Sequence, residues 1–288
     1  MTAEAIGIVV LMTLIAGVGG TGLGGLLGAL FKTESNRVIS MLLSITSGVM
    51  ISIVCFELME ESIEAAQTFA GDNAVFVVSL AVVVGVAVIA LLNHVIDTRT
   101  RTQVPHTAEP NHPATHDAID ELMHVDHYNE HVQTHGSKRD LWVAGVVIAF
   151  AIALHNIPEG MSIGASYNVD LGSVGSAALV LAILIGLHNI PEGMAVAVPL
   201  IAGGMSRPRA VILTACSGLP LVLGALLGFW LGDIGPLGLS ASLGFASGAM
   251  LYVVFGEILP QAILMYRSKM PAFFLIAGML IGVIIINF

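Results

Sequence analysis

The chain has 288 residues, of which 56% are hydrophobic and only 10% are charged. Soluble globular chains carry about 25% charged residues, so this composition excludes an ordinary soluble enzyme and a disordered regulator. Twenty acidic residues against ten basic ones also exclude a nucleic-acid-binding protein, which would need a basic face. The mean hydropathy of +0.91 instead indicates a protein that is embedded in a lipid bilayer.

Eight apolar segments are long enough to cross a membrane, since a helix needs about 20 apolar residues to span the hydrocarbon core. They lie at about 5–31, 37–66, 74–96, 141–165, 173–202, 210–232, 238–266 and 271–288. The first segment is not expected to be a signal peptide, because it starts with the acidic Glu4 and runs too long. We therefore expect an all-α polytopic membrane protein with one transmembrane domain over residues 1–288.

The basic residues support this count and give an orientation. With eight spans, all ten lysines and arginines fall in connections on one side of the membrane. The positive-inside rule makes that side cytoplasmic, so both termini should lie outside the cytoplasm. No nucleic-acid partner is expected.

Four acidic residues lie close together in the second span, in the order Glu57, Glu60, Glu61 and Glu64. We interpret them as an acidic entrance that concentrates cations, with Glu57 and Glu61 as its main candidates. For Glu60, Glu61 and Glu64 a solvated helix end is the alternative, whereas Glu57 lies deeper in the span.

The third span ends in a polar group, Asn93, His94 and Asp97. His94 and Asp97 are candidates for receiving a released cation, and capping of the helix at the membrane surface is the alternative.

A polar loop over residues 98–139 follows the third span and holds seven of the ten histidines. Its second half could form a short helix with His124, His127 and His131 on one face and His135 one turn further on. The loop is expected to be cytoplasmic. It is either a weak, exchangeable metal-binding segment that modulates or buffers, or a polar connector that is merely rich in histidine.

Two sequence repeats connect spans that run in opposite directions. The hexapeptide HNIPEG occurs at 155–160 in span 4 and again at 188–193 in span 5. Residues 47–63 of span 2 match residues 247–263 of span 7 at six of 17 positions, and the match pairs Glu57 with Glu257. The pattern predicts that spans 1–3 are related to spans 6–8 by an inverted repeat, with spans 4 and 5 central. Such repeats, with substrate near the midplane, are typical of secondary transporters.

The repeated hexapeptide carries the donor atoms of a metal site. In each copy His and Glu are four residues apart and share a helix face, and Asn adds a neutral oxygen. The candidate ligands are His155, Asn156, Glu159, His188, Asn189 and Glu192. Two carboxylates match a divalent cation, and nitrogen with oxygen ligands suits zinc, iron, manganese, cobalt or nickel better than calcium or magnesium. Intramembrane acids are costly, so a duplicated His–Glu pair favours function over packing.

These observations favour a secondary carrier of divalent transition metal ions that works by alternating access. Glu257 would then mark an inner exit or a proton relay. No G-x-x-x-x-G-K-[ST] motif of an ATP-driven motor is present. An intramembrane zinc hydrolase is an alternative, but H-E-x-x-H is absent. A metal-gated channel or sensor is the other alternative.

On the HNIPEG pair, the eight spans, the outside termini and the His-rich loop, the chain resembles the ZIP (Zrt-, Irt-like protein) family of divalent metal transporters. The paired motif resembles the prokaryotic, broad-substrate branch. The resemblance implies import of zinc, with iron, manganese, cobalt, nickel or cadmium as further cargo, across the inner (plasma) membrane of a prokaryote. It also implies a homodimer, no resident cofactor, and movement of spans 1, 4, 5 and 6 against spans 2, 3, 7 and 8.

The six residues of the two motifs carry over as metal ligands by this resemblance. One position departs from the family pattern, because Leu221 stands where prokaryotic relatives tend to have a glutamate in span 6. We therefore expect one primary metal ion, with a second ion weak or absent.

Overall fold

The computed structural model describes residues 3–30, 36–100, 138–170 and 177–287, and this part of the chain contains helices and no strand. The expectation of an all-α membrane protein is confirmed. The α-helices are α1 (Ala3–Leu14), α2 (Gly20–Leu30), α3 (Asn36–Ile53), α4 (Met59–Ala70), α5 (Ala74–Thr100), α7 (Lys138–Asp170), α8 (Ala177–Ala202), α9 (Arg207–Ser217), α10 (Pro220–Asp233), α11 (Pro236–Val253), α12 (Leu259–Met265) and α13 (Met270–Asn287).

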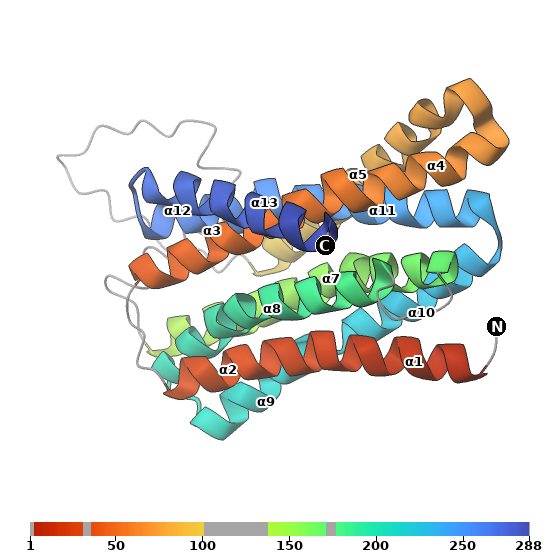
Figure 1. The fold of residues 1–288 in the computed structure, drawn as a ribbon. Coiled ribbons are helices and arrows are strands. Elements are labelled where there is room, and N and C mark those ends of the chain that lie inside the picture. Colours follow the sequence, from red (N-terminus) through yellow and green to blue (C-terminus); the bar gives the residue numbers. More distant parts are fainter. Residues whose placement is uncertain (1–2, 31–35, 101–137, 171–176, 288) are drawn as a thin grey trace.

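Seven helical stretches of the described residues are long and apolar enough to cross a bilayer. One of them, Arg37–Val95, has 59 residues. A straight helix of that length would measure about 88 Å, roughly three times the hydrocarbon core. The chain reverses within it at Gly71, whose φ of 52° is in the region that favours glycine, and α4 and α5 form a hairpin (Figure 1). The turn lies in the gap that the sequence predicts between spans 2 and 3, and the eight-span count itself stays a prediction.

Span 6, expected as one helix over 210–232, is divided into α9 and α10. The division falls at Gly218 and Leu219, directly before Pro220. Proline lacks the N–H that would continue a helix and is favoured at a first helical position, so a new helix begins there.

Among the described residues, three helices contain a π-helical turn, at Ile15–Gly19, Val54–Leu58 and Val254–Ile258. The second and third lie at matching positions of the sequence repeat, and each has its glutamate, Glu57 or Glu257, as the fourth residue. Single π turns inside α-helices are frequent at functional sites. The shared irregularity supports the repeat that the sequence predicts.

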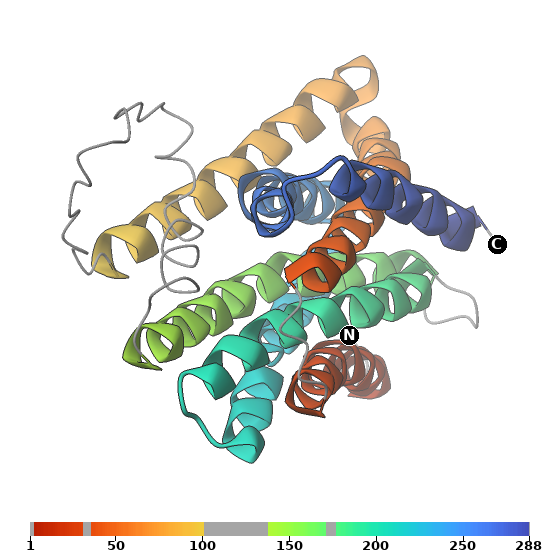
Figure 2. The ribbon, with the colours of Figure 1, turned by 90° about the vertical axis from the view of Figure 1, so that its left-hand side faces the viewer.

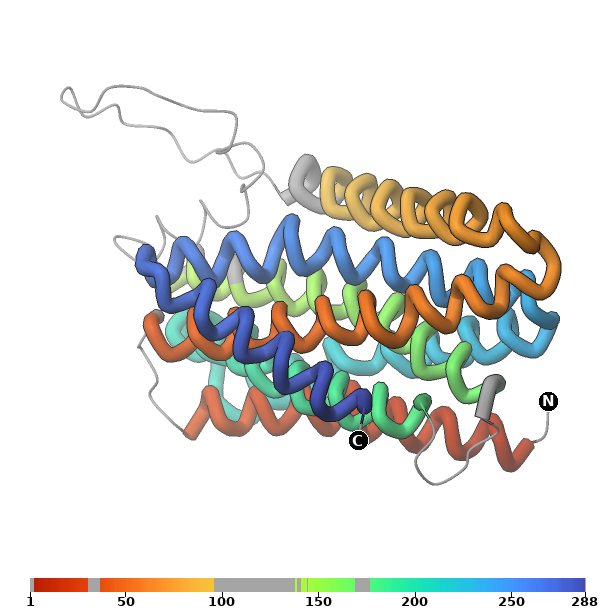
Figure 3. The backbone as a smooth tube through the Cα atoms, turned by 45° about the horizontal axis from the view of Figure 1, so that its top comes forward, coloured from red at the N-terminus to blue at the C-terminus, as the bar shows by residue number. Residues whose placement is uncertain are grey.

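The helices pack as two groups. The first bundle contains α1, α2, α7, α8, α9 and α10, and the second bundle contains α3, α4, α5, α11, α12 and α13. Figure 1 shows the second bundle above the first, and the views of Figures 2 and 3 agree. These groups correspond to spans 1, 4, 5 and 6 and to spans 2, 3, 7 and 8.

Close backbone contacts at glycines hold each bundle together. A Cβ added to Gly160 of α7 would overlap the carbonyl oxygen of Leu221 in α10, and one added to Gly48 of α3 would overlap that of Leu275 in α13. Small residues allow such approach between membrane helices. Between the bundles, the described glycines make this contact only beside the α10–α11 turn, where Gly238 meets Leu231.

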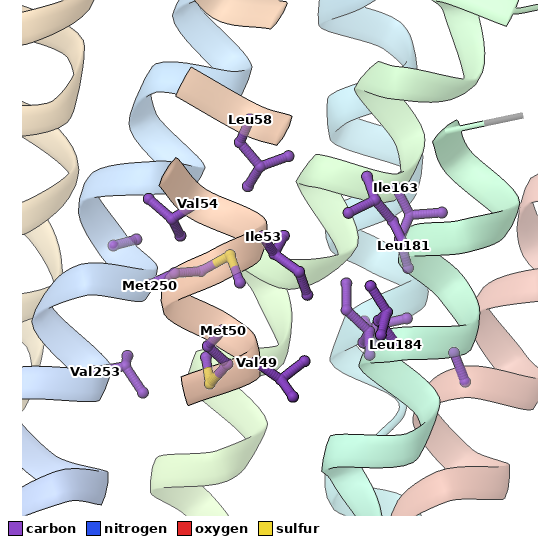
Figure 4. Packing of buried hydrophobic residues seen from close by; sticks show 14 of the residues in the cluster. Val49, Met50, Ile53, Val54, Leu58, Ile163, Leu181, Leu184, Met250 and Val253 are labelled. Carbon is purple, nitrogen blue, oxygen red and sulfur yellow. The ribbon is translucent and has the colours of Figure 1, made fainter. Parts of the chain in front are cut away.

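The face between the bundles is packed by larger side chains. Figure 4 shows Val49 and Ile53 of α3 on one side and Ile163 of α7 and Leu184 of α8 on the other. Ile53 and Ile163 are fully buried, and Leu184 is 1% exposed. The two bundles therefore meet through side chains, whereas each bundle is held internally by backbone contact.

Candidate metal site

The two HNIPEG motifs lie on α7 and α8, which pack side by side in the first bundle (Figure 1). Each helix continues through its motif proline, Pro158 or Pro191. All six candidate ligands are buried, with no more than 5% of any of them exposed. Burial of so many polar side chains in an apolar protein indicates that they face one another or other helices rather than lipid.

Three of these side chains form a cluster suited to a metal ion. One ligand atom from each of Glu159, His188 and Glu192 lies within 4.8 Å of the others. The closest pair, His188 Nε2 and Glu159 Oε1, is 3.2 Å apart. Ligands of a tetrahedral zinc ion, each about 2.1 Å from the metal, lie about 3.4 Å apart. The cluster is thus close to the dimensions of a metal site.

The cluster also contains polar atoms that the protein leaves unpaired. Within the described residues, Glu159 Oε2, both carboxylate oxygens of Glu192 and His188 Nδ1 are buried without a hydrogen-bond partner. Buried carboxylate oxygens without partners are costly, and two carboxylates so close together repel each other. A divalent cation would satisfy these oxygens and neutralise their charge.

His155 lies outside this cluster and points to the other bundle. Its Nε2 atom is 2.8 Å from Glu257 Oε2, on the π turn that precedes α12. The other oxygen of Glu257 accepts a hydrogen bond from Asn93 Nδ2 of α5. The first motif is therefore divided, with Glu159 in the three-residue cluster and His155 in a polar contact between the bundles.

The motif asparagines donate hydrogen bonds to backbone carbonyls where neighbouring helices are interrupted. Asn156 Nδ2 donates to the carbonyl of Ser217, where α9 ends, at 3.1 Å. Asn189 Nδ2 donates to the carbonyl of Ala16, in the first π turn, at 3.2 Å. Interrupted helices leave carbonyls without partners, which must be satisfied in a membrane. The amide oxygens of both asparagines are buried and lack a partner among the described residues, so they remain able to bind a cation.

The four acidic residues of the second span differ in how far they are buried. Glu57 and Glu61 are half-buried, whereas Glu60 and Glu64 are exposed. Glu61 Oε2 accepts a hydrogen bond from Ser166 Oγ of α7 at 2.7 Å. Ser166 is thus a second polar link between the bundles. It is not among the residues predicted from the sequence, although its position seven residues after Glu159 places it near the same helix face.

The remaining candidates lie away from the cluster or outside the described residues. His94 is exposed on α5, and the side chain of Asp97 on the same helix is not among those described. The loop candidates His124, His127, His131 and His135 also lie outside the described residues. Leu221 is fully buried on α10. In the described ranges, one group of three metal-ligating side chains is present, and the number of bound ions stays a prediction.

The family model described as ZIP Zinc transporter matches residues 4–288. Several bacterial relatives named Zinc transporter ZupT match most of the chain. The protein of Akkermansia muciniphila is 31% identical, with 99% of each chain covered. That of Chlorobaculum parvum is 34% identical, covering 94% of this chain and 93% of the relative. That of Campylobacter jejuni is 32% identical, with 99% and 98% covered.

These matches favour a transporter over the intramembrane hydrolase. The matching family is one of zinc transporters, and the relatives carry a transporter's name. The helices are those of a multi-pass membrane protein. The chain therefore belongs to the ZIP zinc transporter family and is a membrane transporter of divalent metal ions rather than an enzyme.

Proposed function

We propose that the chain imports zinc, holding the ion during passage with Glu159, His188 and Glu192. The observation that carries this proposal is the buried cluster with its unpaired carboxylate oxygens. A dication between two carboxylates and a neutral imidazole leaves no net charge to bury. The amide oxygens of Asn156 and Asn189 are further donors. No thiolate is among these ligands, which favours an affinity low enough for release.

We propose further that three polar contacts along α7 form the path of the ion. Ser166 with Glu61, Glu159 with its partners, and His155 with Glu257 follow one another over eleven residues, about 16 Å of helix. The outer two contacts join the bundles, and the middle cluster lies within the first bundle. In this proposal Glu61 and Glu57 receive the ion, and His155 and Glu257 take it over for release.

Alternating access would follow from movement of the first bundle against the second. Packed elements slide past each other most easily where no backbone contact locks them. The close glycine contacts support this. Among the described glycines they lie inside one bundle or the other, and the exception is Gly238, beside the α10–α11 turn. A rigid first bundle would carry the site from one side to the other.

Several finer expectations stay proposals that rest on the family resemblance and on the sequence. They are a homodimer, the inner membrane of a prokaryote, both termini outside the cytoplasm, and import toward the His-rich loop. Because metal binding needs a neutral imidazole and ionised carboxylates, protons compete with the ion. Zinc uptake should therefore fall as the pH is lowered.

Purified protein in liposomes should take up zinc in a saturable way, at rates below those of a channel. His188→Ala should strongly reduce uptake, because it removes the only nitrogen of the cluster. His106→Ala is the matched control, since His106 is not among the candidate ligands. Equal uptake by the two variants would remove the proposed site, and uptake that does not saturate would favour a metal-gated channel.

A further inference from the structure

An elongated cavity of about 640 Å³ lies between the two bundles. Its walls come from α5 and α11 of the second bundle and from α7 and α10 of the first, with Val84, Phe245, Pro158 and Leu227 as one example from each. Ser242 is the one polar residue of its lining, and that side chain is only 1% exposed. The cavity is therefore a hydrocarbon-like space.

The shape of the cavity limits what can occupy it. Its lining on α5 runs from Val77 to Leu92, which is about 22 Å of helix. A volume of 640 Å³ spread over that length makes the space narrow. A helix with its side chains is about 10–12 Å wide and does not fit. The space is long and narrow.

The cavity opens sideways toward the membrane. On α5, the lining residues Leu80, Val84 and Leu92 are still 66%, 45% and 39% exposed. On α7 the lining includes Pro158, which is buried, and Met161, which is 4% exposed. The open side thus leads from the bilayer to residues that are otherwise inside the protein.

We propose that this cavity binds one acyl chain of a membrane lipid. Apolar cavities of this kind do not hold water, because a water molecule needs two to four polar partners. Acyl chains are the apolar, narrow and flexible molecules that surround the protein at this depth. The lining offers no charge to a headgroup, so chains are bound without selection of the headgroup.

The bound chain touches both bundles beside the metal motif. Pro158 lines the cavity, and the next residue, Glu159, belongs to the metal cluster. An acyl chain keeps this part of the interface filled while leaving it without the close backbone contacts that hold each bundle together. Its presence would ease sliding of one bundle past the other, whereas a fixed side chain in its place would hinder it.

The test uses the full chain in phosphatidylcholine vesicles that contain a phosphatidylcholine with a photoreactive diazirine on one acyl chain. Val84→Trp fills the cavity, and Val83→Trp is the matched control, because Val83 is 61% exposed and does not line it. After irradiation, we expect label on the α7 peptide that contains Met161 in the unmodified protein and in Val83→Trp. Val84→Trp should lose most of this label.

Equal labelling of the Met161 peptide in both variants, or no label there in the unmodified protein, would overturn the proposal. A cross-link from a photoreactive amino acid at position 84 to a second copy of the chain would overturn it as well. In uptake assays, Val84→Trp should be about threefold slower than Val83→Trp, since the conformational step and not zinc binding is affected. The labelling result is independent of transport, so it stands even if the proposed ion path is wrong.

Discussion

The two copies of HNIPEG have the same sequence and different surroundings. In α8, His188 and Glu192 both belong to the metal cluster. In α7, only Glu159 does, because His155 is paired with Glu257 of the second bundle. The comparison teaches that a repeated motif fixes the donor atoms, while the neighbouring helices decide what each donor does. We therefore expect the second copy to hold the ion, and the first copy both to hold it and to connect it to the other bundle.

The largest effect is expected at the carboxylates of the cluster. Glu159→Gln and Glu192→Gln each remove one of the two negative charges, and zinc binding and uptake should fall by more than about 100-fold, beyond the 10–100-fold typical of outer-shell changes. Equilibrium dialysis with zinc measures the affinity for the ion. Glu60→Gln is the control, because the side chain of Glu60 is exposed.

Thermal stability without zinc distinguishes a metal ligand from a residue that stabilises the fold. Without zinc, Glu192→Gln should raise the melting temperature, because it removes a buried charge without partners. A lower melting temperature in metal-free protein would mean that Glu192 stabilises the fold instead of holding an ion.

The two histidines give the sharpest form of the comparison. His188→Ala should reduce zinc affinity about 100-fold, whereas His155→Ala should change it less than tenfold and slow uptake instead. Binding and uptake are measured on the same preparations. If both variants lose affinity equally, the two copies have equal roles and the proposed division between them is wrong.

A smaller effect is expected at the partner of His155. Glu257→Gln keeps the size of the side chain and its acceptor for Asn93, so zinc binding should stay within about threefold, while uptake falls about tenfold. The measurement is the ratio of the initial uptake rate to bound zinc. Unchanged uptake would show that this contact does not belong to the path.

The smallest effect is expected at the other polar link between the bundles. Ser166→Ala removes one hydrogen bond to Glu61, whose side chain is only half-buried. Uptake should change by no more than about threefold, because the half-buried Glu61 can accept a hydrogen bond from water in place of the lost one. Loss of all uptake would indicate that Ser166 itself binds the ion.

Much of this molecule can be predicted from the sequence because the membrane restricts the choices. Every predicted span overlaps described helix, and the turn at Gly71 falls in the predicted gap. Burial of the six motif residues also follows from the cost of exposing them to lipid. Helical spacing explains why Glu159, His188 and Glu192 can meet once α7 and α8 pack together.

The rest depends on contacts between distant parts of the chain. The repeat pairs Glu257 with Glu57, but nothing in it indicates that Glu257 lies beside His155. Glu57 and Glu257 lie in π turns, so the α-helical period of about 3.6 residues does not predict which way these side chains face. The motif asparagines bond to Ser217 and Ala16 because the neighbouring helices are interrupted there, and the first π turn has no sequence signal as clear as Pro220.

The central claim is that the ion is held by Glu159, His188 and Glu192, and anomalous X-ray scattering at the zinc edge tests it most directly. Crystals of the zinc-loaded full chain should show a peak about 2.0–2.2 Å from an imidazole nitrogen of His188 and from carboxylate oxygens of Glu159 and Glu192. A peak held by His155 and Glu257, with nothing bound between the other three side chains, would contradict it.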